Sequence, residues 1–446
     1  MDQPEKDPQL MSTTRAPHRT DRPHLLERRR RRLRALMAAL VMAGSTSISV
    51  GSSPIPVAAD VLPAAQGLIV GLVDGTTIDE LTARHGILVI GSLAALDAYL
   101  VVWTDGRPAD LVEAELALDP AVDFVNQNQT VRTPEVAFSG RIYKWATAEP
   151  GAGAEQWAAA RLGLASAHAV TTGAGITVAV IDTGLDLGDP TFIGLVATGV
   201  DFVDGDSVPS DDRNGIDENG NGDVDEAAGH GTFVAGLVHL VAPSARLMPV
   251  RVLDSDGNTD TFTLALAMVW AADHGADVVN LSLGQSGSST LVKAAVDLLW
   301  SRGVLAVGAA GNEARSRDSF PAGAKCAIDV TSTGATDRIS AFASTSSNID
   351  VAAPGEDLVS NFPFSGTGSA SWSGTSMSTP LVAGEVALLR AMRPDLPLGT
   401  IARLVVRSGP IALGAVGSMN GVRRVDVAAA VHRTATATPF STDCLQ

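Results

Sequence analysis

Cysteine and aromatic residues are scarce in this chain of 446 residues, which has two cysteines and 4% aromatics. Two cysteines are too few for a disulfide framework. In an exported protein Cys326 and Cys444 could pair and pin the C-terminal tail to the body, but Cys326 could equally be a small buried side chain. Abundant glycine and alanine, with 45% apolar residues, indicate a large and tightly packed α/β core rather than disorder.

Positive charge is scarce outside the N-terminus. The chain has 32 Lys and Arg against 49 Asp and Glu, and its first 34 residues hold 10 of the basic and 5 of the acidic ones. The remainder therefore carries 22 basic and 44 acidic residues, a net charge of −22. Such an acidic protein is a poor partner for nucleic acid and stays soluble in an open medium. We expect no nucleic-acid partner.

The apolar run over residues 33–44, broken only by Arg34, is too short for a comfortable membrane span. It follows the basic run 28–32 and precedes the small residues 57–59, an order typical of an export signal. A basic arm for nucleic acid is the poorer interpretation, because an apolar stretch follows directly. We expect residues 1–59 to be a disordered tail plus export signal, with a twin-arginine signal, a mistaken start codon or a retained anchor left open.

Residues 60–132 have the pattern of a compact unit. Strands are predicted over 67–73, 87–90, 99–103 and 122–125, and helices over 78–85 and 109–118. The resulting order, β-α-β-β-α-β, is that of a ferredoxin-like fold. The Pro- and Gly-rich segment 133–155 that follows is typical of a linker.

Two segments in the next part of the chain end in groups that can handle a proton. The apolar, β-branched run 176–181 is typical of a buried parallel strand, and it is followed by Asp182. Open α/β sheets build their sites at such carboxyl ends. His230 lies between glycines at the start of an apolar helix, where an imidazole can take up a proton near neutral pH. Taken alone, the aspartate could cap a turn and the histidine could be structural.

Two later segments could supply a nucleophile and an oxyanion donor. Asn312 follows the buried strand pattern 304–310 and presents a side-chain amide. Ser376 stands at a strand-to-helix turn, Gly374-Thr375-Ser376, where the start of a helix favours developing negative charge. A turn asparagine and a helix cap are the ordinary alternatives for each residue alone.

In this order, Asp182, His230, Asn312 and Ser376 resemble the subtilisin-like serine proteases, and the resemblance covers residues 156–431. It implies a three-layer α/β sandwich with a mostly parallel central sheet, and a catalytic domain over 156–433. It also implies that Ser376 is the nucleophile, His230 the base and then acid, and Asp182 the group that orients the imidazole. The amide of Asn312 and the backbone N–H of Ser376 would form the oxyanion hole, supported by Thr375.

One departure from the family concerns packing rather than catalysis. Phe233 stands where many relatives carry a second histidine.

The resemblance also implies where an extended peptide would bind, and what activity results. Two small-residue strand ends would form the walls of the pocket for the residue before the scissile bond: Ser282, Leu283, Gly284, Ala309, Ala310 and Gly311. Such walls predict a broad preference for uncharged side chains. The expected activity is an endopeptidase that acts through an acyl-enzyme, with protein or peptide substrates and no organic cofactor.

Residues 60–132 resemble the inhibitory propeptides of the same family. We therefore expect this unit to assist folding, to inhibit the enzyme intramolecularly and to be removed by self-cleavage within 133–155. The enzyme is expected to be a secreted monomer that contacts the membrane only during export, with retention at the cell envelope left open. Residues 434–446 are expected to be a flexible tail.

An acidic loop precedes His230, and part of it has the spacing of a calcium-binding loop. The candidate ligands are Asp217, Asn219, Asn221, Asp223 and Asp225. The twelfth position of this pattern is Ala228 instead of glutamate, so an EF-hand is not expected. A structural calcium on this surface loop and a solvated turn are both left open.

Two other functions share these residues. The chain could be a proteolytically inactive binding protein on the same fold, although all four catalytic positions are filled. It could also be dedicated to peptide ligation or to maturation of one precursor, which needs the same chemistry.

Overall fold

The computed structural model describes residues 67–135, 156–314, 316, 319–414, 419 and 421–445. The chain divides into two units, residues 1–54 and 55–446. The expected export signal and most of the expected linker lie outside the described residues. Among the described helices, none is both long and apolar enough to cross a membrane.

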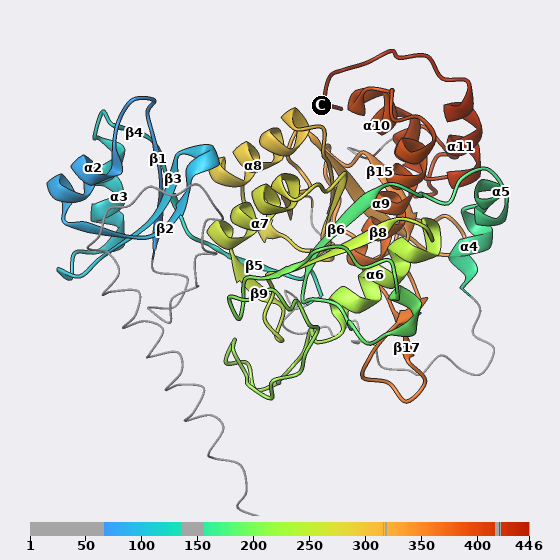
Figure 1. Ribbon diagram of the computed structural model, residues 1–446, viewed down its shortest axis with the longest axis horizontal. Coiled ribbons are helices and arrows are strands. Elements are labelled where there is room, and N and C mark those ends of the chain that lie inside the picture. Colours follow the sequence, from blue (N-terminus) through green and yellow to red (C-terminus); the bar gives the residue numbers. More distant parts are fainter. Residues whose placement is uncertain are drawn as a thin grey trace, which may run out of the picture. The chain divides into compact units, whose positions relative to one another are not determined.

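The first described part of the chain is a four-stranded antiparallel sheet with two helices. Its elements, labelled in Figure 1 where there is room, are β1 (Leu68–Leu72), α2 (Ile78–His85), β2 (Ile87–Leu93), η2 (Ala94–Leu96), β3 (Ala98–Trp103), α3 (Ala109–Ala117) and β4 (Val122–Gln127). The strand order is β2-β3-β1-β4, which confirms the predicted ferredoxin-like arrangement. The predicted strand 87–90 was too short, because β2 continues to Leu93.

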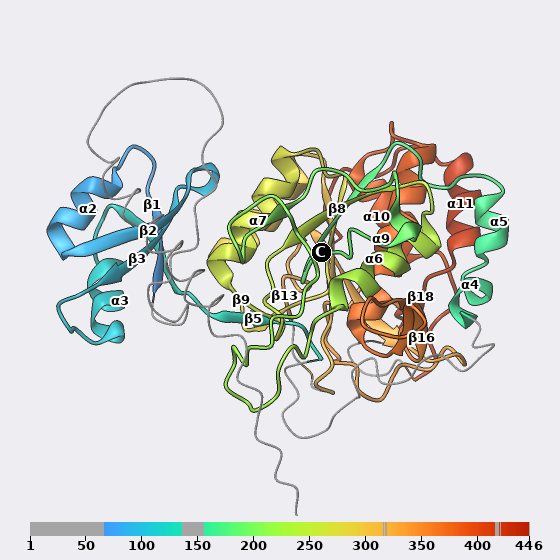
Figure 2. The ribbon, with the colours of Figure 1, turned by 60° about the horizontal axis from the view of Figure 1, so that its bottom comes forward.

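β1 is buried along its whole length because both faces of its sheet are covered. Leu68, Val70 and Leu72 pack with residues of α2 and α3, which lie beside the sheet in Figure 2. Ile69 points to the opposite face and belongs to a different core cluster. A strand buried on both faces forms a continuous apolar run, as the sequence of β1 does.

The second part is built on an eight-stranded sheet with the order β18-β15-β14-β12-β10-β6-β8-β7, in which every recorded strand pair is parallel. Its strands are β6 (Thr177–Asp182), β7 (Val200–Asp201), β8 (Arg246–Arg251), β10 (Val278–Leu281), β12 (Leu305–Ala309), β14 (Ala327–Thr333), β15 (Val351–Pro354) and β18 (Arg423–Arg424). This confirms the predicted mostly parallel sheet. Shorter strand pairs are β11 (Gln285–Ser286) with β13 (Ser319–Phe320) and β16 (Leu358–Asn361) with β17 (Ser369–Trp372).

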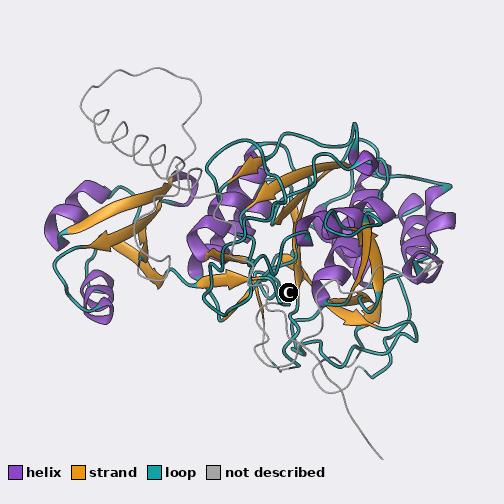
Figure 3. Ribbon diagram, turned by 90° about the horizontal axis from the view of Figure 1, so that it is seen from below, coloured by secondary structure: helices purple, strands orange, loops and turns teal. Residues whose placement is uncertain are grey.

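Helices on both faces complete three layers (Figure 3). One core cluster joins the sheet to α4 (Trp157–Arg161), α5 (Leu164–His168), α6 (His230–Val241), α9 (Thr375–Met392), α10 (Leu398–Val406) and α11 (Val427–Ala435). The other joins it to α7 (Thr261–Asp273) and α8 (Thr290–Ser301). In β6, Val178 and Val180 belong to the first cluster and Ala179 and Ile181 to the second, because successive side chains point to opposite faces.

The free face of the small sheet packs against the layer of α7 and α8. Ile69, Leu93 and Ala98 share a core cluster with residues of these two helices. The ring of Phe262 in α7 lies so close to Gly91 in β2 that a Cβ at this glycine would come within 2.8 Å of it. The apolar residues on this face are therefore buried against the larger part of the chain.

A short strand that the sequence did not predict follows this sheet. β5 (Thr130–Arg132) pairs antiparallel with β9 (Asn258–Asp260), and Arg132 also bridges to Gly284. Main-chain hydrogen bonds therefore hold the segment on both sides. The side chain of Val131, in the middle of β5, is fully buried.

The two cysteines form a disulfide across 118 residues of sequence, which answers the question that the sequence left open. The side chain of Arg403 donates hydrogen bonds to Ser441 Oγ and to the carbonyl oxygens of Asp443 and Cys444. These bonds and the disulfide attach the segment after α11 to α10 and to the residue before β14.

Removing this disulfide is expected to destabilise the protein. A crosslink that closes a loop of this length contributes about 4–5 kcal/mol in the chain-entropy description of the unfolded state. We expect a Cys326→Ala, Cys444→Ala variant to unfold at clearly lower denaturant concentration, measured in a Ser376→Ala background to prevent degradation. Adding reductant should shift the parent protein in the same direction and leave the double variant unchanged. Equal midpoints for the parent and the double variant would contradict the prediction.

Candidate active site

Asp182 and His230 meet at the carboxyl end of the central sheet. Asp182 is the last residue of β6, and His230 is the first residue of α6. The imidazole Nδ1 lies 2.7 Å from Asp182 Oδ1, and both side chains are fully buried. Gly231 lets the start of α6 lie against the turn that follows β6, because a Cβ there would lie 2.2 Å from the carbonyl oxygen of Gly184. The structure thus brings together two residues that are 48 positions apart.

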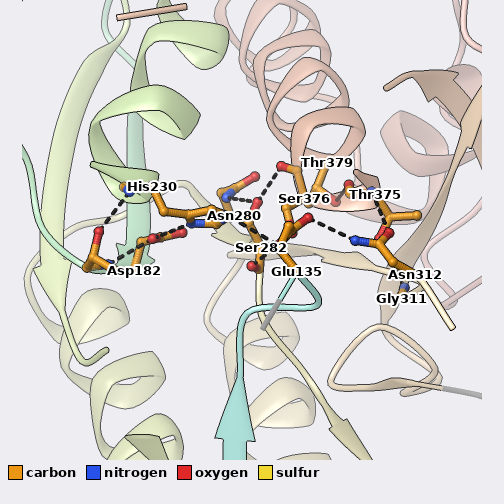
Figure 4. Close-up of polar contacts among 12 residues, drawn as sticks. Glu135, Asp182, His230, Asn280, Ser282, Gly311, Asn312, Thr375, Ser376 and Thr379 are labelled. Carbon is orange, nitrogen blue, oxygen red and sulfur yellow. Dashed lines mark hydrogen bonds and ion pairs between the residues drawn. The ribbon is translucent and has the colours of Figure 1, made fainter. Parts of the chain in front are cut away.

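Ser376 is the second residue of α9, and its hydroxyl lies on the side of α9 that faces Glu135 and His230 (Figure 4). Its Oγ donates to Glu135 Oε2 at 2.9 Å and lies 3.2 Å from the carbonyl oxygen of Ser282. His230 Nε2 lies 3.4 Å from the same Glu135 Oε2. One carboxylate oxygen of Glu135 therefore lies next to both the hydroxyl and the imidazole.

The side chain of Asn312 is oriented by Thr375, the first residue of α9. Asn312 Oδ1 accepts hydrogen bonds from the backbone N–H and the hydroxyl of Thr375, at 2.9 and 3.0 Å. With its oxygen held in this way, the amide turns its NH₂ group toward Ser376, where it donates to Glu135 Oε1 at 2.9 Å. An N–H donor directed at this point can stabilise negative charge that forms on an oxygen there.

The pKa of His230 is strongly perturbed. Burial acts to lower it, but the charge of Asp182 and the hydrogen bond to it act in the opposite direction, as does the nearby carboxylate of Glu135. Together the two carboxylates raise the pKa of His230 to about 10.

A cavity of about 320 Å³ lies beside this cluster, and part of the predicted substrate-binding set lines it. Gly284, Ala310 and Gly311 are in its wall. Ser282, Leu283 and Ala309 are buried, and the Ser282 hydroxyl donates to the carbonyl oxygen of Ser376 at 2.8 Å. Asn312, predicted in another role, also lines the cavity. The remaining lining residues were not predicted from the sequence: Thr130, Arg132, Pro134, Gln285, Ser286, Glu313, Ser319 and Ser344.

Asp211 is a further buried residue that sequence reasoning missed. Its carboxylate accepts hydrogen bonds from Thr183 Oγ1 at 3.0 Å, from the backbone N–H of Gly229 at 2.8 Å, and from the backbone N–H and hydroxyl of Thr232 at 2.9 and 2.7 Å. Burial raises its pKa. Asp211 thus joins the residue after Asp182 to the first turn of α6, which begins with His230. The sequence gave no useful signal, because Asp211 lies in a loop with many exposed acidic residues.

Most of the predicted calcium ligands make hydrogen bonds within the acidic loop. Asp217 and Asp225 accept hydrogen bonds from backbone N–H groups of the loop itself, while Asn219 and Asn221 donate to Glu226. In the described part of the chain, no group of three or more His, Cys, Asp or Glu side chains is arranged to hold a metal ion. The arrangement of these side chains therefore gives the calcium prediction no support.

Comparison with known proteins identifies the relatives of this chain. Residues 173–429 match the Peptidase_S8 family, described as the subtilase family. Thermitase of Thermoactinomyces vulgaris is 39% identical over 230 residues, which cover 49% of this chain and 76% of thermitase. Subtilisin BL of Lederbergia lenta is 36% identical over 249 residues, which cover 54% of this chain and 85% of that protein.

Among solved structures, the chain is similar to fervidolysin of Fervidobacterium pennivorans, described as a keratinolytic enzyme related to subtilisin. The TM-score is 0.68 at 24% identity, over 84% of this chain and 61% of fervidolysin. At this identity the likeness concerns the fold alone.

Proposed function

Since the chain belongs to the subtilase family and is a serine-type endopeptidase, we propose that Ser376 is its nucleophile, His230 its base and then acid, and Asp182 the group that orients the imidazole. The observation that carries this proposal is the shared contact at Glu135 Oε2. Ser376 Oγ and His230 Nε2 both face this oxygen, while His230 Nδ1 is held by Asp182.

In the proposed reaction, the carbonyl of a peptide bond takes the place that the Glu135 carboxylate occupies in the structure. Ser376 Oγ attacks the carbonyl carbon as its proton passes to His230 Nε2. The amide of Asn312 and the backbone N–H of Ser376 stabilise the negative charge on the carbonyl oxygen. The C–N bond then breaks, and the amine leaves with the proton from His230. Water attacks the resulting ester, with His230 again moving the proton, and releases the carboxylic acid and the free serine.

Substrates are proposed to bind as an added strand between β9 and Gly284, in the manner of β5. Arg132 shows the kind of contact expected: its N–H donates to the carbonyl oxygen of Gly284 at 3.0 Å, and the N–H of Gly284 donates back at 2.8 Å. Such bonds recognise backbone rather than side chains. The broad preference for uncharged side chains before the scissile bond stays a prediction, and a peptide library that is cut only after basic residues would contradict it.

The proposal includes a zymogen. The ferredoxin-like unit would inhibit the enzyme intramolecularly through the segment that begins with β5, and self-cleavage within 133–155 would release it. Support comes from the burial of Glu135, whose side chain is only 1% exposed between the groups named above. We further propose a secreted monomer without an organic cofactor. A structural calcium stays a prediction, which fails if a chelator leaves the melting temperature unchanged.

The test combines three measurements on the secreted protein: digestion of casein, N-terminal sequencing and labelling with a fluorophosphonate. We expect digestion, a new N-terminus within 133–155 and label on Ser376. A proteolytically inactive binding protein would take up no label. A ligase or dedicated maturation enzyme would take up label but would leave casein intact and, if it ligates, would join peptides in the presence of an added amine.

Asp211 is expected to act as a positioning residue for the Asp182 and His230 pair. An Asp211→Asn variant replaces one carboxylate oxygen with an NH₂ group that faces N–H and O–H donors, so the first turn of α6 should shift. We expect kcat to fall about 10- to 100-fold, the usual cost of a small misplacement of a catalytic group. KM should change little, because Asp211 acts on the Asp182 and His230 pair and not on the substrate.

The matched control is Asp212→Asn, which removes the same charge from the adjacent, exposed residue. Both variants should be compared at equal content of folded protein. Equal kcat values for the two variants, or a change in KM alone, would contradict a positioning role.

A further inference from the structure

Glu135 contacts three proposed catalytic groups at once. Its Oε1 accepts the amide of Asn312 at 2.9 Å, and its Oε2 accepts the hydroxyl of Ser376 at 2.9 Å and lies 3.4 Å from His230 Nε2 (Figure 4). One oxygen thus takes the donor intended for an oxyanion, and the other lies next to both nucleophile and base. The group at the centre of the site is a side-chain carboxylate, not a peptide carbonyl.

The fit around this carboxylate is close. A Cβ on Gly374, the residue before α9, would lie 2.1 Å from Glu135 Oε1. The chain before Glu135 is also held: β5 is paired with β9, and Arg132 and Gly284 exchange two main-chain hydrogen bonds. This pairing ends three residues before Glu135 and keeps the backbone of the segment next to the site.

The carboxylate also changes the state of the base. The charged groups recorded against the imidazole are Asp182 from β6 and Glu135 from the segment after β5, and the neutral ring of Trp372 in β17 packs edge-on at 5.2 Å. Although burial opposes it, these two carboxylates raise the pKa of His230 to about 10. A raised pKa favours the protonated imidazole, which cannot accept the serine proton. Ser376 instead donates to Glu135.

We propose that Glu135 is a carboxylate latch: its side chain fills the oxyanion position and lies against both the nucleophile and the base, so that self-cleavage begins only after this side chain leaves. The inference rests on the proposed function and assigns the inhibition to one named group. The pairing of β5 alone would place the segment in the cleft. The Glu135 carboxylate is what disables the reacting groups.

The latch has a definite pH dependence. The pKa of His230 is higher in the closed state, with Glu135 in place, than in the open state, because the negative charge of Glu135 has then moved away. Between these two pKa values the closed state holds one more proton than the open state. Raising the pH through this window therefore favours the open state, by up to about tenfold per pH unit. Self-cleavage should accelerate accordingly from neutral toward alkaline pH.

The test follows self-cleavage of the full chain by gel and N-terminal sequencing from pH 5 to 10. A Glu135→Gln variant keeps the size of the side chain and removes its charge. We expect it to cleave itself about tenfold faster or more at neutral pH, with its pH profile shifted to lower pH. The matched control is Glu80→Gln, which makes the same change at an exposed position of α2 and should behave as the parent.

A second measurement reads the base directly. In a full chain that carries Ser376→Ala, the titration of His230 can be followed by NMR with labelled histidine. We expect an alkaline midpoint in this protein, the same midpoint after adding Glu80→Gln, and a clearly lower one after adding Glu135→Gln. Equal midpoints with and without the Glu135→Gln change overturn the latch.

The outcomes separate the latch from the wider proposal. If the parent cleaves itself and Glu135→Gln is no faster, the latch is wrong while the protease assignment stands. If the parent neither cleaves itself nor reacts with a fluorophosphonate after its N-terminal unit is removed by another protease, the proposed function fails, and the latch fails with it.

Discussion

Replacing Ser376 with alanine is expected to lower kcat about 10⁶-fold, the size of loss known for related subtilisins. Among the described residues, no other hydroxyl is recorded as donating to Glu135 Oε2, so none is placed to take over the attack. The variant should remain as the full chain, because self-cleavage needs the same nucleophile. Hydrolysis of a chromogenic peptide measures the first effect, and N-terminal sequencing measures the second.

Two further variants make this test specific. Ser373→Ala removes a partly exposed hydroxyl just before α9, whose recorded contacts are with Asp357, and should leave kcat near that of the parent. Ser376→Ala combined with His230→Ala should be no slower than either single variant, because the two groups act as one unit. A Ser376→Ala protein that is processed as fast as the parent in isolation would contradict self-cleavage. One that hydrolyses peptide near the parent rate would remove Ser376 from its role.

Replacing Asn312 with leucine is expected to lower kcat about 10²- to 10³-fold with little change in KM. The amide N–H matters only when negative charge develops on the carbonyl oxygen, and the loss of such a donor costs about 3–4 kcal/mol in related subtilisins. Steady-state kinetics that report kcat and KM separately measure this effect. A rise in KM at constant kcat would instead assign Asn312 to ground-state binding.

A second variant separates the role of the Asn312 NH₂ donor from that of the contact between Asn312 Oδ1 and Thr375. Asn312→Asp keeps an oxygen that can accept from the backbone and hydroxyl of Thr375, as Oδ1 does in the structure, but replaces the NH₂ donor. We expect both variants to be impaired. Near-normal activity of Asn312→Asp beside a large loss in Asn312→Leu would mean that the residue serves only to hold the first turn of α9.

Much of the fold could be predicted because many of its strands and helices are apolar and the neighbouring residues of each one favour the same secondary structure. The runs over 176–181 and 304–310 have the continuous apolar character of buried parallel strands, and the structure has β6 and β12 there. His230 lies between glycines, and a Cβ at Gly231 would indeed collide with the carbonyl oxygen of Gly184. Elements of this kind are encoded by residues that are near one another in sequence.

The contacts that complete the site are of another kind. β5 is three residues long, and its partner β9 lies more than a hundred positions later, so the local pattern around 130–132 contains no strand signal. Asp211 looks like any other acid of its exposed loop until the chain folds Thr183 and the start of α6 around it. Its role depends on burial, which local sequence does not reveal.

By itself, the sequence determined which groups this protein has for chemistry and on which strands and helices they stand, because strand and helix periodicity and the glycines beside them are local properties. Only the tertiary structure decided that the side chain of Glu135 enters the centre of the site and that Cys326 meets Cys444. Both depend on long-range packing of the sheets, which brings distant segments within bonding distance.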